Sequence, residues 1–169
     1  TDEDEPNAAV FSKAELAISG SGSLTVNGNY NDGITSKDGL TISNGTIVVT
    51  AKDDGIRGKD YIIVTGGIFT INATGDGFSS DNAEDTTKGY ISIENGSINI
   101  TAKGDGLAAE TNVNITGGDI TVTTGGGSSA SIAASDSAKG IKGVAGITIS
   151  GGTFNINSAD DGIHSGGAI

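Results

Sequence analysis

Apolar and polar residues alternate in short runs that recur along this chain. In one unit Ile91 and Ile93 alternate with polar neighbours, a glycine corner follows, and Ile98 and Ile100 form a second alternating run. Alternation over three to five residues predicts half-buried β-strands. Related units occupy residues 16–26, 40–50, 62–72, 113–123 and 147–157. The chain is therefore predicted to repeat a pair of short strands joined at a glycine corner.

The repeat has a period of 22 residues. The second glycine of each corner lies at position 45, 67, 96, 118 or 152, so the two longer intervals are the same unit with insertions of 7 and 12 residues. Such strands are too short for a sandwich and favour a solenoid, in which equivalent residues stack about 4.8 Å apart. We predict an all-β fold, a single-stranded parallel β-helix with 22 residues per coil and six to seven coils.

Three apolar ladders are expected to fill the interior of this helix, each with one residue per coil. They are Leu40, Ile62, Ile91, Val113 and Ile147; Ile47, Phe69, Ile98, Ile120 and Phe154; and Ile34, Ile56, Phe78, Leu107, Ile141 and Ile163. Because the ladders gather the apolar side chains in one place, a hydrophobic content of only 34% is enough for a core.

The expected domain organisation is an acidic linker at residues 1–9 and a β-helix domain at residues 10–169. The first residues, TDEDEP, form a charge run typical of a solvated segment. The N-terminal segment is a candidate cap for the solenoid. The last residues end where another strand is due, so the domain is expected to continue in the natural protein.

Composition and charge exclude several classes of function. A net charge of -12, from 21 acidic and 9 basic residues, argues against nucleic-acid binding. The absence of cysteine excludes disulfides and thiolate zinc sites, and a single histidine excludes a multi-histidine metal site. No apolar run approaches the 18 residues of a membrane span, so no membrane insertion is expected. The acidic surplus suits a protein that collects cations.

An Asp-Gly pair follows most of the units and points to calcium. Stacking would place Asp32, Asp54, Asp76 and Asp105 in one corner, with a second acidic set five or six residues later at Asp38, Asp60, Asp81 and Glu110. Carboxylates about 5 Å apart repel by roughly 3 kcal/mol at an effective dielectric near 20. Bound Ca²⁺ would relieve this repulsion, so these eight acids are candidate ligands. The alternative is a simple turn dipeptide, in which Asp bonds the local backbone and Gly supplies a positive φ.

Basic and aromatic residues suggest contacts with a sugar. Lys37, Arg57 and Lys59 lie near the acidic positions, where they could hold a sugar carboxylate beside Ca²⁺ or form ordinary surface ion pairs. Tyr61 and Tyr90 occupy equivalent positions, as a structural aromatic ladder or as a platform for sugar rings. His164 is interpreted as a surface residue, because no nucleophile motif accompanies it.

Several segments together resemble a known family. They are GNYNDGI at 28–34, KDDGIRGKD at 52–60, SSDNAEDTTKGY at 79–90, TGGGSSA at 124–130 and SADDGIHS at 158–165. They are similar to the bacterial carbohydrate-binding-domain proteins with a polysaccharide-lyase-like β-helix, found in cellulose degraders, and the resemblance covers the chain from about Val10. It implies a secreted, calcium-bearing, right-handed β-helix that binds plant cell-wall polysaccharides, namely cellulose and pectic polymers such as polygalacturonate.

Two functional hypotheses follow from these observations. The first is a non-catalytic, extracellular, calcium-dependent polysaccharide-binding protein. The alternative is a calcium-dependent pectate lyase, in which a Lys or Arg base removes the C5 proton of the sugar. Lys37, Lys59 and Arg57 are the candidate bases, and a lysine would need a pKa lowered by burial. An ice-binding helix would need a uniform outward threonine array, which the outward residues Thr41, Ile63, Ser92, Asn114 and Thr148 do not form.

Overall fold

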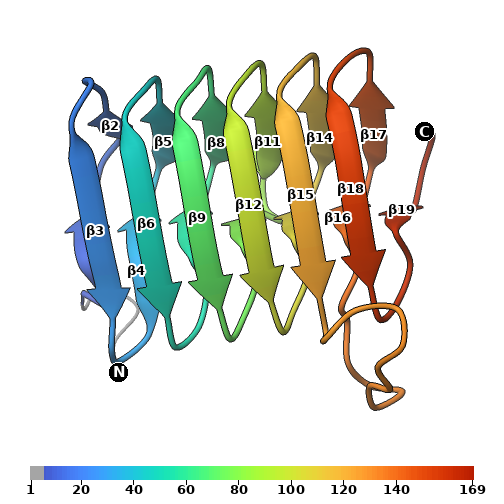
Figure 1. The fold of residues 1–169 in the computed structure, drawn as a ribbon. Coiled ribbons are helices and arrows are strands. Elements are labelled where there is room, and N and C mark those ends of the chain that lie inside the picture. The colour runs from blue at the N-terminus through green and yellow to red at the C-terminus, as the bar shows by residue number, and fades with distance from the viewer. Residues whose placement is uncertain (1–5) are drawn as a thin grey trace.

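Each full coil of the chain contributes one strand to each of three parallel sheets in the computed structural model, which describes residues 6–169 (Figure 1). Sheet A contains β1 (Ala8–Ser12), β4 (Asp32–Ser36), β7 (Ile56–Gly58), β10 (Phe78–Ser80), β13 (Leu107–Ala109), β16 (Ile141–Gly143) and β19 (Ile163–Ser165). Sheet B contains β2 (Leu16–Ile18), β5 (Gly39–Ile42), β8 (Tyr61–Val64), β11 (Tyr90–Ile93), β14 (Asn112–Ile115) and β17 (Gly146–Ile149). Sheet C contains β3 (Ser23–Gly28), β6 (Thr46–Ala51), β9 (Ile68–Ala73), β12 (Ser97–Ala102), β15 (Asp119–Thr124) and β18 (Thr153–Ser158). The predicted parallel β-helix is confirmed.

The parallel register stacks equivalent residues and builds the three predicted ladders. On sheet A, Ile34 pairs with Ile56, and Ile56 pairs with Phe78. On sheet C, Phe69 pairs with Ile98 in the same way. These side chains are almost completely buried, and the ladders loosen only at the C-terminal end, where Ile163 is 38% exposed.

Two kinds of glycine hold the coils in shape. The corner between sheets B and C needs a left-handed backbone, which Gly45 adopts with φ of 101° and Gly96 with φ of 129°. Gly55 of an Asp-Gly pair differs, since it lacks a positive φ but a Cβ there would lie 2.4 Å from Ile71 Cγ2 in the core. The expectation that Asp-Gly supplies a positive φ is therefore wrong here, and close packing requires the glycine instead.

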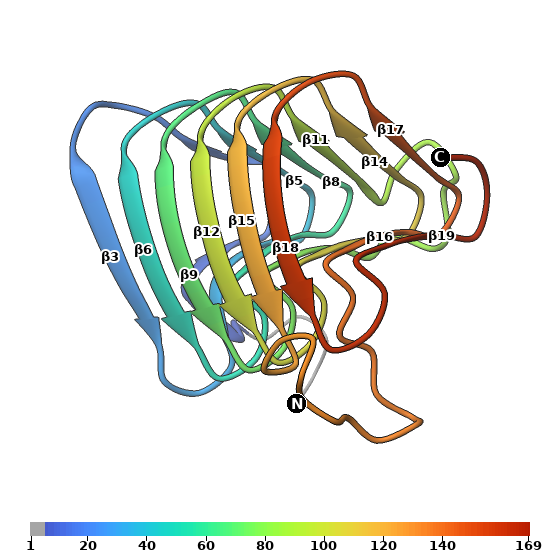
Figure 2. The ribbon, with the colours of Figure 1, turned by 45° about the vertical axis from the view of Figure 1, so that its right-hand side comes forward.

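The strands begin two residues before the expected domain boundary. β1 starts at Ala8 and pairs with β4, so the N-terminal segment adds a strand to sheet A. Residues 1–5 of the expected acidic linker lie outside the described residues. The longer insertion, between β15 and β16, projects from the body of the helix in Figure 2. Within residues 6–169, no helix has the length and apolar character needed to cross a membrane.

Candidate functional site

The outer face of sheet A carries two cations on one row of side chains. Because successive side chains in a strand point to opposite faces, the residues beside the buried ladder point outward. In register, this outer row contains Thr35, Arg57, Ser79, Ala108, Lys142 and His164. The small residues Ser79 and Ala108 therefore leave space between Arg57 and Lys142.

The predicted acidic column lies along one side of this row. The carboxylate of each aspartate accepts a hydrogen bond from the backbone N–H of the equivalent residue in the next coil. Asp54 Oδ1 accepts from Asp76 at 2.8 Å, and Asp76 Oδ1 accepts from Asp105 at 2.7 Å. The series starts at Asp32 and ends at Lys139, whose N–H donates to Asp105 Oδ1 at 2.7 Å. The column is thus a hydrogen-bond ladder between coils, and its carboxylates do not bond the local backbone as a turn dipeptide would.

Burial makes the middle of the column reluctant to ionise. Desolvation raises the pKa of Asp54 to about 6, although the N–H of Asp76 partly offsets the effect. Desolvation, followed by the neighbouring charge of Asp54, raises the pKa of Asp76 to about 7. The pKa of Asp32 is also raised by burial, despite its hydrogen bond from Thr35. The column therefore carries less negative charge near neutral pH than four exposed carboxylates would.

Arg57 closes one end of the column. Its guanidinium pairs with Asp81 and lies 3.9 Å from Asp32 Oδ2. Burial alone would lower the pKa of Arg57, but the hydrogen bond to Asp81 and the nearby carboxylates outweigh it and raise the pKa. Arg57 is therefore a fixed positive charge on the face.

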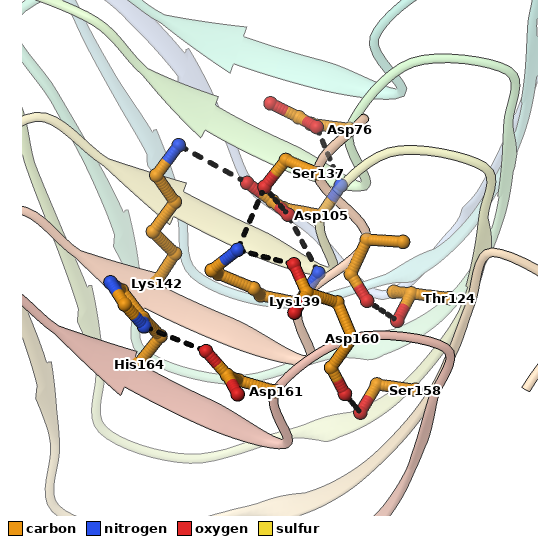
Figure 3. A network of polar contacts seen from close by, with 11 residues as sticks. Asp76, Asp105, Thr124, Ser137, Lys139, Lys142, Ser158, Asp160, Asp161 and His164 are labelled. Carbon is orange, nitrogen blue, oxygen red and sulfur yellow. Dashed lines mark hydrogen bonds and ion pairs between the residues drawn. The ribbon is translucent and has the colours of Figure 1, made fainter. Parts of the chain in front are cut away.

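Lys142 closes the other end, and sequence reasoning missed it. Its Nζ lies 3.4 Å from Asp105 Oδ2, as Figure 3 shows. The available signal was the tripeptide Ile141-Lys-Gly143, which repeats Ile56-Arg-Gly58 at the equivalent place in the coil. The long insertion before Lys142 obscured that equivalence.

A dense polar network surrounds the Lys142 end of the face (Figure 3). Asp105 Oδ1 also accepts from Ser137 Oγ at 2.7 Å, so both oxygens of Asp105 have partners. Lys139 replaces the aspartate of the column and pairs with Asp160, whose hydrogen bond raises the pKa of Lys139. The exposed His164 contacts Asp161, with 2.8 Å between Nδ1 and Oδ2.

The second acidic set occupies two neighbouring positions rather than one column. Asp81 and Glu110 directly follow the paired residues Ser80 and Ala109 of sheet A. Asp60 lies one position further along its coil, and its carboxylate accepts from Asn82 at 2.6 Å and lies 2.8 Å from Lys88 Nζ. Burial opposes ionisation of Asp60, but these partners prevail and lower its pKa. Asp38 lies at the equivalent position in the preceding coil, since the N–H of Asp60 bonds its carbonyl.

A hollow of about 140 Å³ lies in the middle of the face, between the acidic column and the following corner. Asp76, Asp81, Glu110, Ser79 and Lys142 line it. One carboxylate oxygen of Asp76 accepts the N–H of Asp105, and one of Asp81 pairs with Arg57, so the other oxygen of each has no partner among residues 6–169. Within residues 6–169, however, no group of three or more Asp, Glu or His side chains is arranged to hold a metal ion by itself.

The predicted lysines and tyrosines lie at the corner and on sheet B beside this face. Lys37 and Lys59 occupy equivalent positions after β4 and β7, and neither makes an ion pair within the described part of the chain. The rings of Tyr61 and Tyr90 stack with centroids 5.6 Å apart. Tyr61 also covers Gly39 and donates to Glu15 Oε1 at 2.9 Å, so the structural aromatic ladder is present.

Comparison with known proteins gives three matches. The sequence profile of carbohydrate-binding domain-containing proteins matches residues 1–169. A protein of Acetivibrio thermocellus with the same description is 43% identical over 49 residues, which are 29% of this chain and 17% of that protein. The solved structure of the polysaccharide lyase-like protein from C. thermocellum, a gadolinium derivative, is 33% identical with a TM-score of 0.78 over 90% of this chain and 58% of that chain. The chain thus spans less than two thirds of either relative.

Proposed function

The chain belongs to the family of carbohydrate-binding domain-containing proteins, and from this premise we propose that the outer face of sheet A binds an acidic plant cell-wall polysaccharide, with polygalacturonate as the ligand. The observation that carries the proposal is the pair of cations, Arg57 and Lys142, on one row with a hollow between them. Two fixed cations separated by small residues suit a polymer that repeats a carboxylate along its length.

The net charge of -12 works against a polyanion, so binding needs a local field of the opposite sign. Arg57 and Lys142 contribute positive charge but are paired with Asp81 and Asp105, so bound Ca²⁺ and the lysines Lys37 and Lys59 at the neighbouring corner would supply most of this field. The raised pKa values of Asp54 and Asp76 reduce the negative charge beside the row near neutral pH. This reduces the repulsion that the acidic column exerts on a uronate chain.

Calcium is proposed as a bridge between this face and the sugar. Ca²⁺ takes six to eight oxygen ligands. Asp76, Asp81 and Glu110 border the hollow but do not form a complete site, so carboxylates of the polysaccharide would supply the remaining charge. The solved relative is described as a gadolinium derivative, and gadolinium is a hard cation that also favours oxygen.

The other predicted calcium ligands are less suited to this role. In Asp32, Asp60 and Asp105 both carboxylate oxygens already have partners within the protein. Asp54 has one oxygen without a partner among residues 6–169, but it does not line the hollow. Asp38 does not line the hollow either, because it lies at the position that Asp60 takes in the next coil. Of the eight predicted calcium ligands, only Asp76, Asp81 and Glu110 are therefore proposed to bind the ion.

Secretion and binding to cellulose are proposed from the family resemblance. Cellulose is uncharged, so it does not require the cations of sheet A. Tyr61 and Tyr90 remain half-buried in their stack, which leaves only part of each ring for contact with a polymer.

The lyase alternative receives less support than binding. A general base of this kind needs a lowered pKa, whereas the pKa of Arg57 is raised and its guanidinium is held by Asp81. Incubation with polygalacturonate and Ca²⁺, followed by absorbance of the unsaturated product, distinguishes a lyase from a binding protein.

Substitution of the cations tests the binding proposal. Lys142→Gln should weaken retention on polygalacturonate several-fold in a pull-down assay, because it removes one of the two charges of the row. Lys13→Gln is the matched control, since Lys13 is exposed outside the row. Equal retention of the two variants would contradict a binding site on sheet A.

A further inference from the structure

A groove of about 690 Å³ lies on the opposite side of the acidic column from the sheet A row, where sheet C ends. Its lining includes the last residues of β6, β9 and β12, whose arrowheads lie side by side in Figure 1. Its floor contains Ala51, Ala73 and Ala102, which stack in register from coil to coil. None of its lining residues belongs to the outer row of sheet A.

We infer that this groove is a second carbohydrate site, which binds one extended chain of a neutral glycan along the axis of the β-helix. Thr50, Asn72 and Thr101 form one rim and are exposed, with one hydroxyl or amide per coil. The same contact thus repeats about every 4.8 Å, as a polymer of identical units requires. The alanines between the rims are almost completely buried, so the floor is mainly strand backbone, against which a sugar ring can lie between the two rows of side chains.

The opposite rim and one end complete the site. Lys52, Thr74 and Lys103 follow the floor residues in successive coils. The insertion after β15 supplies the end wall, where Ile132 and Asp136 face the groove. An occupant is therefore bounded on both sides and at one end, although the groove remains open to solvent above.

The backbone of the groove favours a sugar over a peptide. The N–H of Lys52 donates to Gly28 O at 3.0 Å, that of Thr74 to Ala51 O at 3.3 Å, and that of Lys103 to Ala73 O at 3.2 Å. A peptide that adds a strand needs unpaired backbone groups at a sheet edge, and these coils are already paired with one another. The remaining donors and acceptors are side-chain hydroxyls, amides and ammonium groups, which match the hydroxyls of a sugar.

The charge of the groove favours a neutral glycan over an acidic one. Of its seventeen lining residues only Lys52, Lys103 and Asp136 are charged. The two lysines lie two coils apart with Thr74 between them, so a chain with a carboxylate on every sugar would leave most of its charges unpaired. The inference rests on the proposed function for its class of ligand, since cellulose is a neutral glycan, and goes beyond it by assigning that glycan to a surface other than sheet A.

Calorimetric titration with cellohexaose, xylohexaose and mannohexaose tests the groove. The triple variant Thr50→Ala, Asn72→Ala, Thr101→Ala should weaken binding of whichever hexasaccharide the native protein binds by at least tenfold. All three side chains are exposed, so the fold should be retained. The control, Thr70→Ala with Asn99→Ala, changes outward residues of β9 and β12 that do not line the groove.

Two further outcomes decide the assignment. The triple variant should retain native binding to polygalacturonate, since it leaves sheet A unchanged, and Lys142→Gln should retain binding of the hexasaccharide. Absence of binding for all three sugars, equal losses in the control variant, or loss of polygalacturonate binding in the triple variant would each overturn the neutral-glycan site. Failure of the sheet A proposal alone would appear as unchanged polygalacturonate binding in Lys142→Gln.

Discussion

The Oδ1 atom of Asp54 accepts a hydrogen bond from the backbone N–H of Asp76 at 2.8 Å. The same contact recurs between Asp76 and Asp105 at 2.7 Å. An aspartate column that looks like a metal site in the sequence is therefore part of the hydrogen bonding that joins successive coils. A cation beside it would neutralise charge, but the column already has protein partners for at least one oxygen of each carboxylate.

The raised pKa values of Asp54 and Asp76 predict an unusual dependence of stability on pH. A carboxyl whose pKa is raised to about 6 or 7 on folding binds protons more tightly in the folded state. Its stabilising contribution is complete below the unfolded pKa of 3.8 and is lost as the pH rises through 6 and 7. Carboxyls with lowered pKa values, such as Asp60, stabilise the fold above their unfolded pKa, and this contribution is lost only as the pH falls through their lower folded pKa. In chelator, Tm should therefore fall between pH 5 and pH 8.

Asp76→Asn isolates this effect. Asparagine keeps an oxygen for the N–H of Asp105 but cannot ionise, so the decrease in Tm between pH 5 and pH 8 should become smaller. At pH 8 the variant should melt a few degrees above the native protein, because about 1 kcal/mol shifts Tm by about 2–4 °C in a domain of this size. Asp119→Asn, at an exposed position on sheet C, is the control. An unchanged pH profile in Asp76→Asn would contradict the raised pKa.

Removal of the acceptor should have the opposite effect from removal of the charge. Asp76→Ala leaves the N–H of the buried Asp105 without its partner, at a cost of about 1–3 kcal/mol. Asp76→Ala should therefore be less stable than Asp76→Asn by this amount in denaturant unfolding at pH 8. Equal stability of the two variants would show that the hydrogen bond between coils does not contribute.

Calcium binding should depend on the sugar. Asp76, Asp81 and Glu110 line the hollow without forming a complete site, so Ca²⁺ should bind weakly alone and at least tenfold more tightly with an oligogalacturonide present. Calcium should also raise Tm more in the presence of the sugar, and chelator should reverse the increase.

Matched glutamates test the ligand assignment. Glu110→Gln should reduce calorimetric calcium affinity in the ternary mixture, because it removes a charged oxygen donor from the hollow. Glu94→Gln changes an exposed glutamate outside the hollow and should have no effect. Tight calcium binding without sugar, equal in both variants, would place the ion elsewhere.

The fold could be predicted because its determinants are local and periodic. One apolar residue per coil at positions such as Ile62 and Ile91 determines the register, and a left-handed glycine at Gly67 or Gly96 determines each corner. At the ends of the solenoid the repeat of apolar and glycine positions is less complete. β1 lacks the Asp-Gly signal of later coils, so its start at Ala8 could not be read from the repeat.

The sites were less predictable because insertions change the spacing of their residues. Asp81 immediately precedes the shorter insertion. In the observed register it lies at the position equivalent to Lys59, and not at that of Asp60. Lys142 follows the longer insertion, in a coil where Lys139 replaces the column aspartate. The groove had no sequence signal, since its floor is alanine and its end wall comes from a low-complexity segment.

Ionic strength should separate the two proposed carbohydrate sites. Attraction between exposed charges is screened over about 8 Å at physiological salt, so polygalacturonate binding at Arg57 and Lys142 should weaken as salt rises. Hexasaccharide binding in the groove uses hydroxyls, amides and apolar contacts, so its affinity should change little between low salt and about 0.5 M, where the screening length is still shorter. Titrations of both ligands on one preparation provide the measurement, and each ligand is the control for the other. A strong salt dependence of hexasaccharide binding would mean that Lys52 and Lys103 dominate the groove, whereas salt-insensitive polygalacturonate binding would remove the cation row from the proposed mechanism.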